Sequence, residues 1–110
     1  MTRIEAEYDQ RTGHCRLTAN GHAEGSEQVC AAVSALLGAL AGYMENARRS
    51  GAVTVWKQQL SGGRAELDFM SSGEEGCGAF LAVCVGLLQV AEQHPDYAEI
   101  SLKERTFFKK

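Results

Sequence analysis

Long apolar runs are scarce in this sequence of 110 residues. The longest, AFLAVCVGLL from Ala79 to Leu88, has about half of the ~20 residues that a helix needs to cross a bilayer. The first ten residues, MTRIEAEYDQ, contain no apolar stretch of the kind that a signal peptide requires. From these absences we expect a cytoplasmic protein that does not enter a membrane.

An excess of positive charge is also missing. Lysine and arginine number 11 against 14 acidic residues, which gives a formal net charge of -3. Binding to nucleic acid or to an anionic membrane usually needs clustered Lys and Arg. The only basic cluster is the C-terminal tail with Lys103, Arg105, Lys109 and Lys110, which we interpret as a solvated terminus. We therefore expect no direct nucleic-acid partner.

The four cysteines, Cys15, Cys30, Cys77 and Cys84, form no Cys-x-x-Cys pair. Zinc-ribbon and thioredoxin-like sites depend on that spacing, so both classes are disfavoured. In a cytosolic protein of this size the thiols should be reduced. His14 neighbours Cys15, but adjacent residues of a strand point to opposite faces. We expect neither a metal site nor a cofactor.

The rest of the composition is that of an ordinary globular protein, with 45% hydrophobic and 23% charged residues. Disordered and fibrous classes are therefore excluded. The length and the even composition predict a single domain over residues 1–110.

Alternating hydrophobicity predicts five strands. The segments Ile4–Tyr8 and Cys15–Ala19 flank the turn DQRTG, and the segments 53–60 and 64–70 flank SGG. A period of two on both sides of a turn is typical of a β-hairpin. A last alternating segment, residues 97–102, predicts the fifth strand.

Helical spacing predicts two helices. Apolar residues recur every three or four positions from Val29 to Ala47, and Gly51 is suited to cap the helix end. A second helix is predicted from about Glu74 to Gln93, where His94-Pro95 ends it. Many residues of the first helix are small, so we expect another element to pack very close to its backbone. These residues are Ala31, Ala32, Ser34, Ala35, Gly38, Ala39, Ala41 and Gly42.

The predicted order is strand, strand, helix, strand, strand, helix, strand. Helices on one face of a mainly antiparallel sheet, in a two-layer α+β domain, satisfy this order (ββαββαβ). Two successive strand-strand-helix units also suggest a weak internal repeat. The strand order is left open.

The stretch GHAEGSEQVC, residues 21–30, places a histidine at a strand end and a cysteine at a helix start. Helix amides and a nearby imidazolium both favour a thiolate, so His22 and Cys30 could form a base and nucleophile pair. Gly21 and Gly25 allow sharp turns and leave backbone N–H groups to stabilise an oxyanion.

A structural interpretation stands beside the catalytic one. Cys30 falls on the same helical stripe as Val33 and Leu37, and unpaired cysteine is among the most buried residue types. His22 could merely form hydrogen bonds within its loop. Spacing alone favours this second interpretation.

The other candidate residues are predicted to be structural. Cys77 and Cys84 lie seven residues apart on one helix face and should be core thiols. Cys15 occupies the apolar phase of a strand. Trp56 is either an anchor for a partner or a core residue, and its alternating strand favours the core.

The residues GHA, then a glycine, an acidic residue and VCAAVSAL, resemble the signature of the ribosomal-processing cysteine proteases, the Prp family of Firmicutes and their relatives. Outside residues 21–37 the resemblance is one of length, element order and helix character. It implies a small, usually dimeric α+β protein. Members of this family remove the N-terminal extension of a large-subunit ribosomal protein after a short hydrophobic, aromatic-containing sequence.

The resemblance implies that His22 is the catalytic histidine and Cys30 the nucleophile, with Gly21, Gly25 and Glu27 in supporting roles. Glu27 stands where the family commonly has aspartate, and Gln28 where it has an apolar residue. The loop between histidine and cysteine is about four residues shorter than in typical members. The alternative is therefore a non-catalytic relative that only binds peptides.

Overall fold

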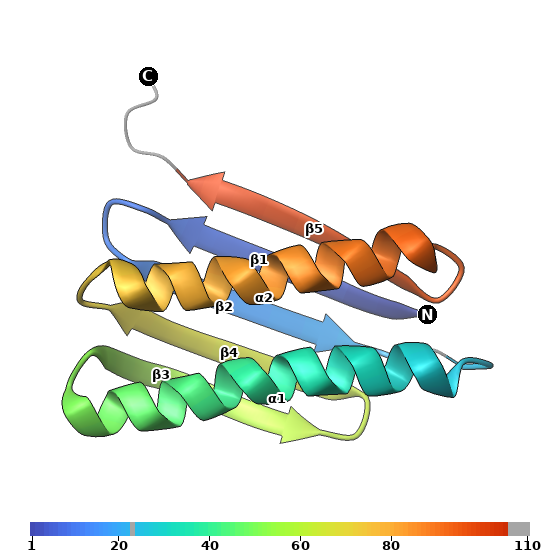
Figure 1. The fold of residues 1–110 in the computed structure, drawn as a ribbon, viewed down its shortest axis with the longest axis horizontal. Coiled ribbons are helices and arrows are strands. Elements are labelled where there is room, and N and C mark those ends of the chain that lie inside the picture. The colour runs from blue at the N-terminus through green and yellow to red at the C-terminus, as the bar shows by residue number, and fades with distance from the viewer. Residues whose placement is uncertain (23, 106–110) are drawn as a thin grey trace.

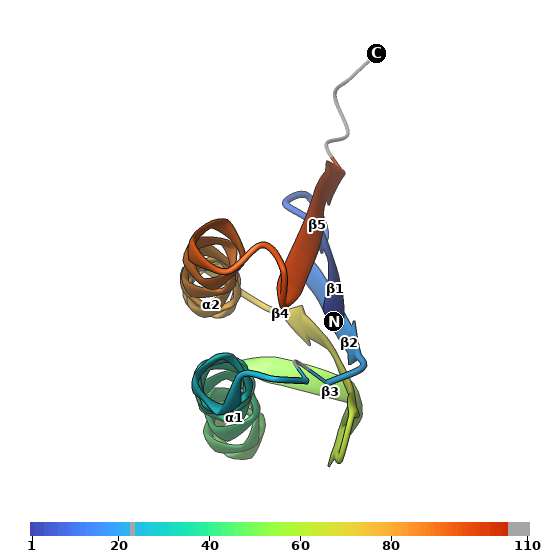
Figure 2. The same ribbon diagram turned by 90° about the vertical axis from the view of Figure 1, so that its right-hand side faces the viewer.

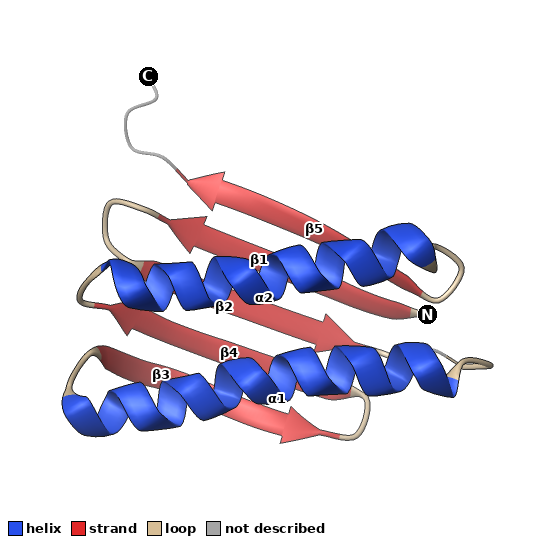
Figure 3. Ribbon diagram, viewed as in Figure 1, coloured by secondary structure: helices blue, strands red, loops and turns tan. Residues whose placement is uncertain are grey.

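The computed structural model describes residues 1–22 and 24–105 of the chain (Figure 1). Its elements follow the predicted order ββαββαβ (Figure 3). They are β1 (Thr2–Asp9), β2 (His14–Asn20), α1 (Glu27–Ser50), β3 (Val53–Ser61), β4 (Arg64–Ser71), α2 (Glu74–Gln93) and β5 (Ala98–Arg105). Lys109 and Lys110 of the basic tail lie outside the described residues.

Both helices lie on one face of a single sheet, and no described element covers the other face (Figure 2). The sheet is mixed, because β1 pairs parallel to β5 whereas its other pairs are antiparallel. The two-layer α+β fold predicted from the sequence is thus confirmed.

The strand order is β3-β4-β2-β1-β5, and its first four strands are arranged symmetrically. At the centre, β2 and β4 run antiparallel with Leu17 opposite Leu67. Three residues away on either side, His14 pairs with Met70 and Asn20 with Arg64. The units β1-β2-α1 and β3-β4-α2 are therefore related by an approximate two-fold axis through the Leu17–Leu67 pair, which supports the predicted internal repeat.

The hairpin turns repeat the same relation at the two ends of the sheet. The Gly21 amide donates to the Gly63 carbonyl, and the Ser71 amide donates to the Gly13 carbonyl, both at 2.8 Å. Both turn glycines have a positive φ, 82° at Gly13 and 76° at Gly63. We call the units β1-β2-α1 and β3-β4-α2 the two halves of the fold. In each half, the segment between the second strand and the helix lies beside the hairpin turn of the other half.

The core lies between the sheet and the helices. Alternate residues of β1, β2 and β4 are buried against the helices, as the period of two predicted. Phe69 of β4 and Phe80 of α2 are fully buried and meet edge to face, with ring centroids 6.2 Å apart. Such aromatic pairs contribute ~1 kcal/mol beyond the burial of their area. The buried pair anchors α2 on the centre of the sheet.

The helix α1 begins and ends as its sequence predicts. The Ser26 hydroxyl accepts a hydrogen bond from the Val29 amide at 3.2 Å, which is an N-cap. At the other end Gly51 adopts a left-handed conformation with φ 83°. Arg48 and Arg49 lie in the last turn, where positive charge stabilises the helix dipole.

The prediction of a close neighbour for the small residues of α1 is wrong for most of them. Ala35, Gly38, Ala39 and Gly42 are exposed on the outer face of the helix. A Cβ added at Gly38 or Gly42 would meet nothing within 4 Å. We expected another element to pack close to these small residues, but most of them occupy the face turned away from the sheet.

The helices do approach each other closely at one point on α2. A Cβ at Gly86 would lie 2.9 Å from Cδ2 of Leu36. The close packing of the two helices at this point therefore depends on a glycine of α2, not on the small residues of α1.

The prediction that Trp56 is a core residue is also wrong. Its side chain is 53% exposed, on the uncovered face of the sheet. A β-bulge at this point of β3 leaves Trp56 without a partner, because Val55 pairs with Phe69 and Lys57 already pairs with Asp68. The indole lies across the sheet with its ring centroid 4.9 Å from that of His14.

Both helices are long and apolar enough to cross a membrane, judged by length and composition. Core helices of soluble proteins pass the same test. Here each helix lies along the sheet, and part of its surface is exposed.

Candidate active site at the start of helix α1

The end of β2 fixes the backbone around His22. Gly21 has φ 93°, and its amide donates to the Gly63 carbonyl at 2.8 Å. The Thr2 hydroxyl donates to the Gly21 carbonyl at 3.4 Å, and the Met1 ammonium donates to the His22 carbonyl at 2.7 Å. Contacts from β1 and from the β3–β4 turn therefore hold the backbone of the exposed histidine on both sides.

Cys30 is the fourth residue of α1, and its side chain is partly buried. Its amide donates to the Ser26 carbonyl at 3.2 Å, which is the first hydrogen bond along the helix. Side chains of a helix tilt toward its N-terminus, where the amide dipoles stabilise negative charge. The thiol is thus directed toward the end of the helix that suits an anion.

His22 and Cys30 line one cleft of about 390 Å³ between α1 and the β3–β4 hairpin. The walls carry aliphatic side chains from both elements, Val33 and Leu37 from α1 and Leu60 from β3. The structure therefore brings the predicted histidine and the predicted cysteine to the same concave surface. We call it the His22–Cys30 cleft.

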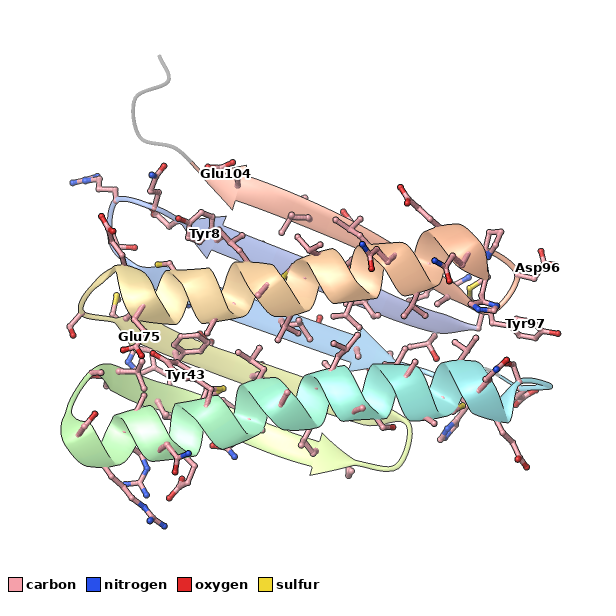
Figure 4. The ribbon with its side chains drawn as sticks, viewed as in Figure 1. Tyr8, Tyr43, Glu75, Asp96, Tyr97 and Glu104 are labelled. Carbon is pink, nitrogen blue, oxygen red and sulfur yellow. The ribbon has the colours of Figure 1, made fainter. Side chains whose placement is uncertain are left out.

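The three supporting residues of the sequence analysis flank this cleft. Gly21 lines it, whereas Gly25 and Glu27 line an adjoining hollow together with Cys30. Gly25 has φ 92°, and a Cβ there would lie 3.5 Å from Cε1 of Tyr97. Tyr97, in the turn before β5, lies at the same end of the molecule as the start of α1 (Figure 4). Ala23 lies outside the described residues.

Sequence analysis missed the part that the β3–β4 turn plays in the cleft. The imidazole of His22 packs against Gly63, a residue distant in the sequence. The SGG turn was visible as a hairpin signal, but its position beside residue 22 depends on the order of the strands.

The sequence pattern of the family described as "Cysteine protease Prp" matches residues 1–99. The chain belongs to the cysteine protease Prp family. No curated protein matches it.

Solved structures share the Prp fold. The S. aureus ribosomal processing protease Prp, in complex with a covalently linked product peptide, has a TM-score of 0.75 at 17% identity, over 94% of this chain and 100% of its own. The Streptococcus mutans protein SMU.848 has a TM-score of 0.66 at 23% identity, with 96% of each chain covered. The S. aureus protease with a substrate peptide has a TM-score of 0.64 at 17% identity, over 94% of this chain and 100% of its own. At these identities the likeness establishes the fold alone.

A Prp-family chain with four cysteines raises the question of which thiols are accessible. Cys15 and Cys84 are fully buried, as predicted. Burial raises the pKa of Cys84 to about 11, and burial together with the nearby Cys77 thiol raises the pKa of Cys15 further. Both are therefore poor nucleophiles at neutral pH.

Cys77 is the counterpart of Cys30 in the other half of this Prp fold, because it is the fourth residue of α2. It is partly buried rather than fully buried, and its thiol lies near Tyr8 and Cys15, where it contributes to raising the pKa of both. Together with Ser72 it lines a second cleft of about 640 Å³. Ser72 occupies the position equivalent to His22, and no histidine is found among the described residues that line this second cleft.

Within the described ranges, 1–22 and 24–105, no group of three or more His, Cys, Asp or Glu side chains is placed to hold a metal ion. The His22–Cys30 cleft itself presents a thiol and an imidazole.

Proposed function

We propose that this protein is a cysteine endopeptidase that removes the N-terminal extension of a large-subunit ribosomal protein. Membership of the Prp family supports the class of reaction, and the S. aureus relative is described as an essential ribosomal processing protease. The observation that carries the proposal is that His22, just after the end of β2, and Cys30, in the first turn of α1, line one cleft.

In the proposed mechanism, His22 accepts the proton of Cys30 and the thiolate attacks the carbonyl carbon of the scissile peptide bond. The C–N bond then breaks as the imidazolium returns the proton to the leaving amine. A thioester remains on Cys30, and water hydrolyses it.

Backbone amides at the start of α1 are the proposed donors to the oxyanion. The first amides of a helix have no carbonyl acceptor within the helix. Among them, the Val29 amide donates to the Ser26 hydroxyl. We propose the amides of Glu27 and Gln28, at the helix end beside Cys30, for this role. Donors held in place in this way stabilise charge as it develops, with no cost of reorganisation.

The substrate is proposed to bind as an extended peptide. The aliphatic walls formed by Val33, Leu37 and Leu60 suit the hydrophobic sequence that the family resemblance implies. The strand β3 is an edge of the sheet, so strand addition beside it is a further means of holding the peptide. The homodimer, the cytoplasmic location and the single domain over residues 1–110 stay predictions.

The test is cleavage of a peptide that carries the host's ribosomal-protein extension, compared between wild type and three variants. Cys30→Ala should abolish cleavage, and His22→Ala should lower it by roughly 10²–10⁴-fold, the usual contribution of a general base. Cys77→Ala is the matched control, because it removes the equivalent thiol of the other half and should leave cleavage unchanged. Equal turnover by Cys30→Ala would exclude the mechanism.

The non-catalytic alternative gives a different result in the same assay. A peptide that binds to wild type, measured by fluorescence anisotropy, but is never cut would identify a peptide-binding relative.

A further inference from the structure

The β3–β4 turn contacts the side chain of His22 directly. Gly63 has φ 76°, a conformation that other residues rarely adopt. A Cβ added to Gly63 would lie 2.5 Å from Nε2 of His22, 3.1 Å from Cε1 and 3.2 Å from Cδ2. The outer edge of the imidazole therefore occupies the space that any side chain at position 63 would need.

We propose that Gly63 is a positioning residue for His22, which sets where the imidazole stands relative to Cys30. This inference rests on the proposed function, because it takes His22 as the base. The Gly63 carbonyl also accepts the Gly21 amide, so one residue holds both the backbone and the ring of the histidine segment. A base must stand within hydrogen-bonding reach of the proton that it removes, so displacing the ring slows the reaction.

Comparison of Gly63 with Gly13, its equivalent in the other half, distinguishes the contact with His22 from the conformation that the hairpin turn requires. Gly13 is the counterpart of Gly63, with φ 82° and the same carbonyl hydrogen bond, here to Ser71. The space beside Gly13 is filled by the backbone of Ser71 rather than by a side chain of the next residue. The hydroxyl of that residue, Ser72, donates instead to Ala52 at 2.9 Å. Both glycines thus have the left-handed conformation, but of the two only Gly63 contacts a ring.

The experiment compares Gly63→Ala with two matched variants. Gly62→Ala changes the neighbouring residue, where a Cβ would meet nothing within 4 Å. Gly51→Ala places alanine at the same kind of positive φ, 83°, again with nothing within 4 Å, and so reproduces the backbone strain alone. The signals of the His22 ring are followed by NMR through a pH titration. Gly63→Ala should shift these signals, and the other two variants should not.

Cleavage supplies the second measurement. Gly63→Ala should lower kcat by roughly 10–100-fold with KM within about twofold, because a misplacement of about 1 Å can cost ~10² in rate. Gly51→Ala should cleave as wild type does. The NMR comparison requires no activity, so it tests the position of the ring even if wild type cuts no peptide and the proposed function fails. Unchanged His22 signals in folded Gly63→Ala would overturn the inference.

A double-mutant cycle covers the case in which Gly63→Ala is poorly folded. His22→Ala removes the three atoms that lie nearest to a Cβ at position 63, whereas the backbone strain remains. The loss of stability caused by Gly63→Ala should therefore be clearly smaller in the His22→Ala background, and similar to that of Gly51→Ala. An equal loss in both backgrounds, or failure of both to fold, would show that the ring contact is not what requires glycine.

Discussion

Replacing Gly38 and Gly42 by alanine should stabilise the protein. Both lie within α1 on its outer face, and a Cβ at either would meet nothing within 4 Å. Glycine in an exposed helix interior costs about 0.8–1.0 kcal/mol relative to alanine, so the double variant should gain about 2 kcal/mol. For a chain of this length, 1 kcal/mol corresponds to about 4 °C in Tm, so the double variant should melt about 8 °C higher.

Thermal unfolding followed by far-UV circular dichroism measures this gain. Gly86→Ala is the control, because its Cβ would lie 2.9 Å from Cδ2 of Leu36, and the contact should offset the gain in helix propensity. A Tm that is unchanged or lower in the double variant would refute the reasoning. It would mean that the outer face of α1 is covered in solution, and a fall in apparent mass on dilution would then identify a second copy as the cover.

Two further predictions concern a buried thiol and a contact between two rings. Because burial raises the pKa of Cys84 from 9.0 to about 11, the contribution of Cys84 to stability should be complete below pH 9 and be lost as the pH rises toward 11. The loss is roughly 3 kcal/mol, and Cys84→Ala should flatten that part of a stability profile measured by urea unfolding, whereas an unchanged slope would contradict it. His14→Ala should shift the emission of the single tryptophan, Trp56, to the red by uncovering the indole that His14 now contacts at 4.9 Å between centroids. An unshifted spectrum in a folded variant would argue against this contact.

Much of the fold could be predicted because its signals are local. The alternation around Leu17 and Leu67 marks strands whose inner faces are buried, and the spacing of Val33, Leu37 and Leu40 marks a helix packed on them. The order of the strands could not be predicted, since it depends on pairing between segments about 50 residues apart, such as Leu17 with Leu67.

The two errors share a physical origin. A periodic pattern shows that a face exists, but it does not show which face meets the core. The small residues of α1, among them Gly38 and Gly42, satisfy helical periodicity on the outer side. Trp56 directly follows Val55, whose partner Phe69 is buried, so the alternation of β3 itself turns Trp56 to the uncovered side.

The candidate site was predictable only in part. His22 and Cys30 could be named from a histidine at a strand end and a cysteine at a helix start, together with the family resemblance. The contact between His22 and Gly63 was out of reach, because it requires β2 and β4 to be neighbours. The proposed reacting groups could be named from local sequence, whereas the packing of the His22 ring against Gly63 depends on the order of the strands.

The β-bulge at Trp56 also decides which side chains of β3 face the cleft. Beyond it, Leu60 stands opposite Ala65, whose side chain is buried on the helix side, so Leu60 shares that side and lines the cleft. Without the bulge, continuous pairing of the same residues from Val55 and Phe69 would place Leu60 opposite Arg64 and turn it to the uncovered side. The parity of the strand beyond Trp56 therefore depends on the bulge, which decides whether Leu60 or Gln59 stands opposite Ala65 on the side of the cleft.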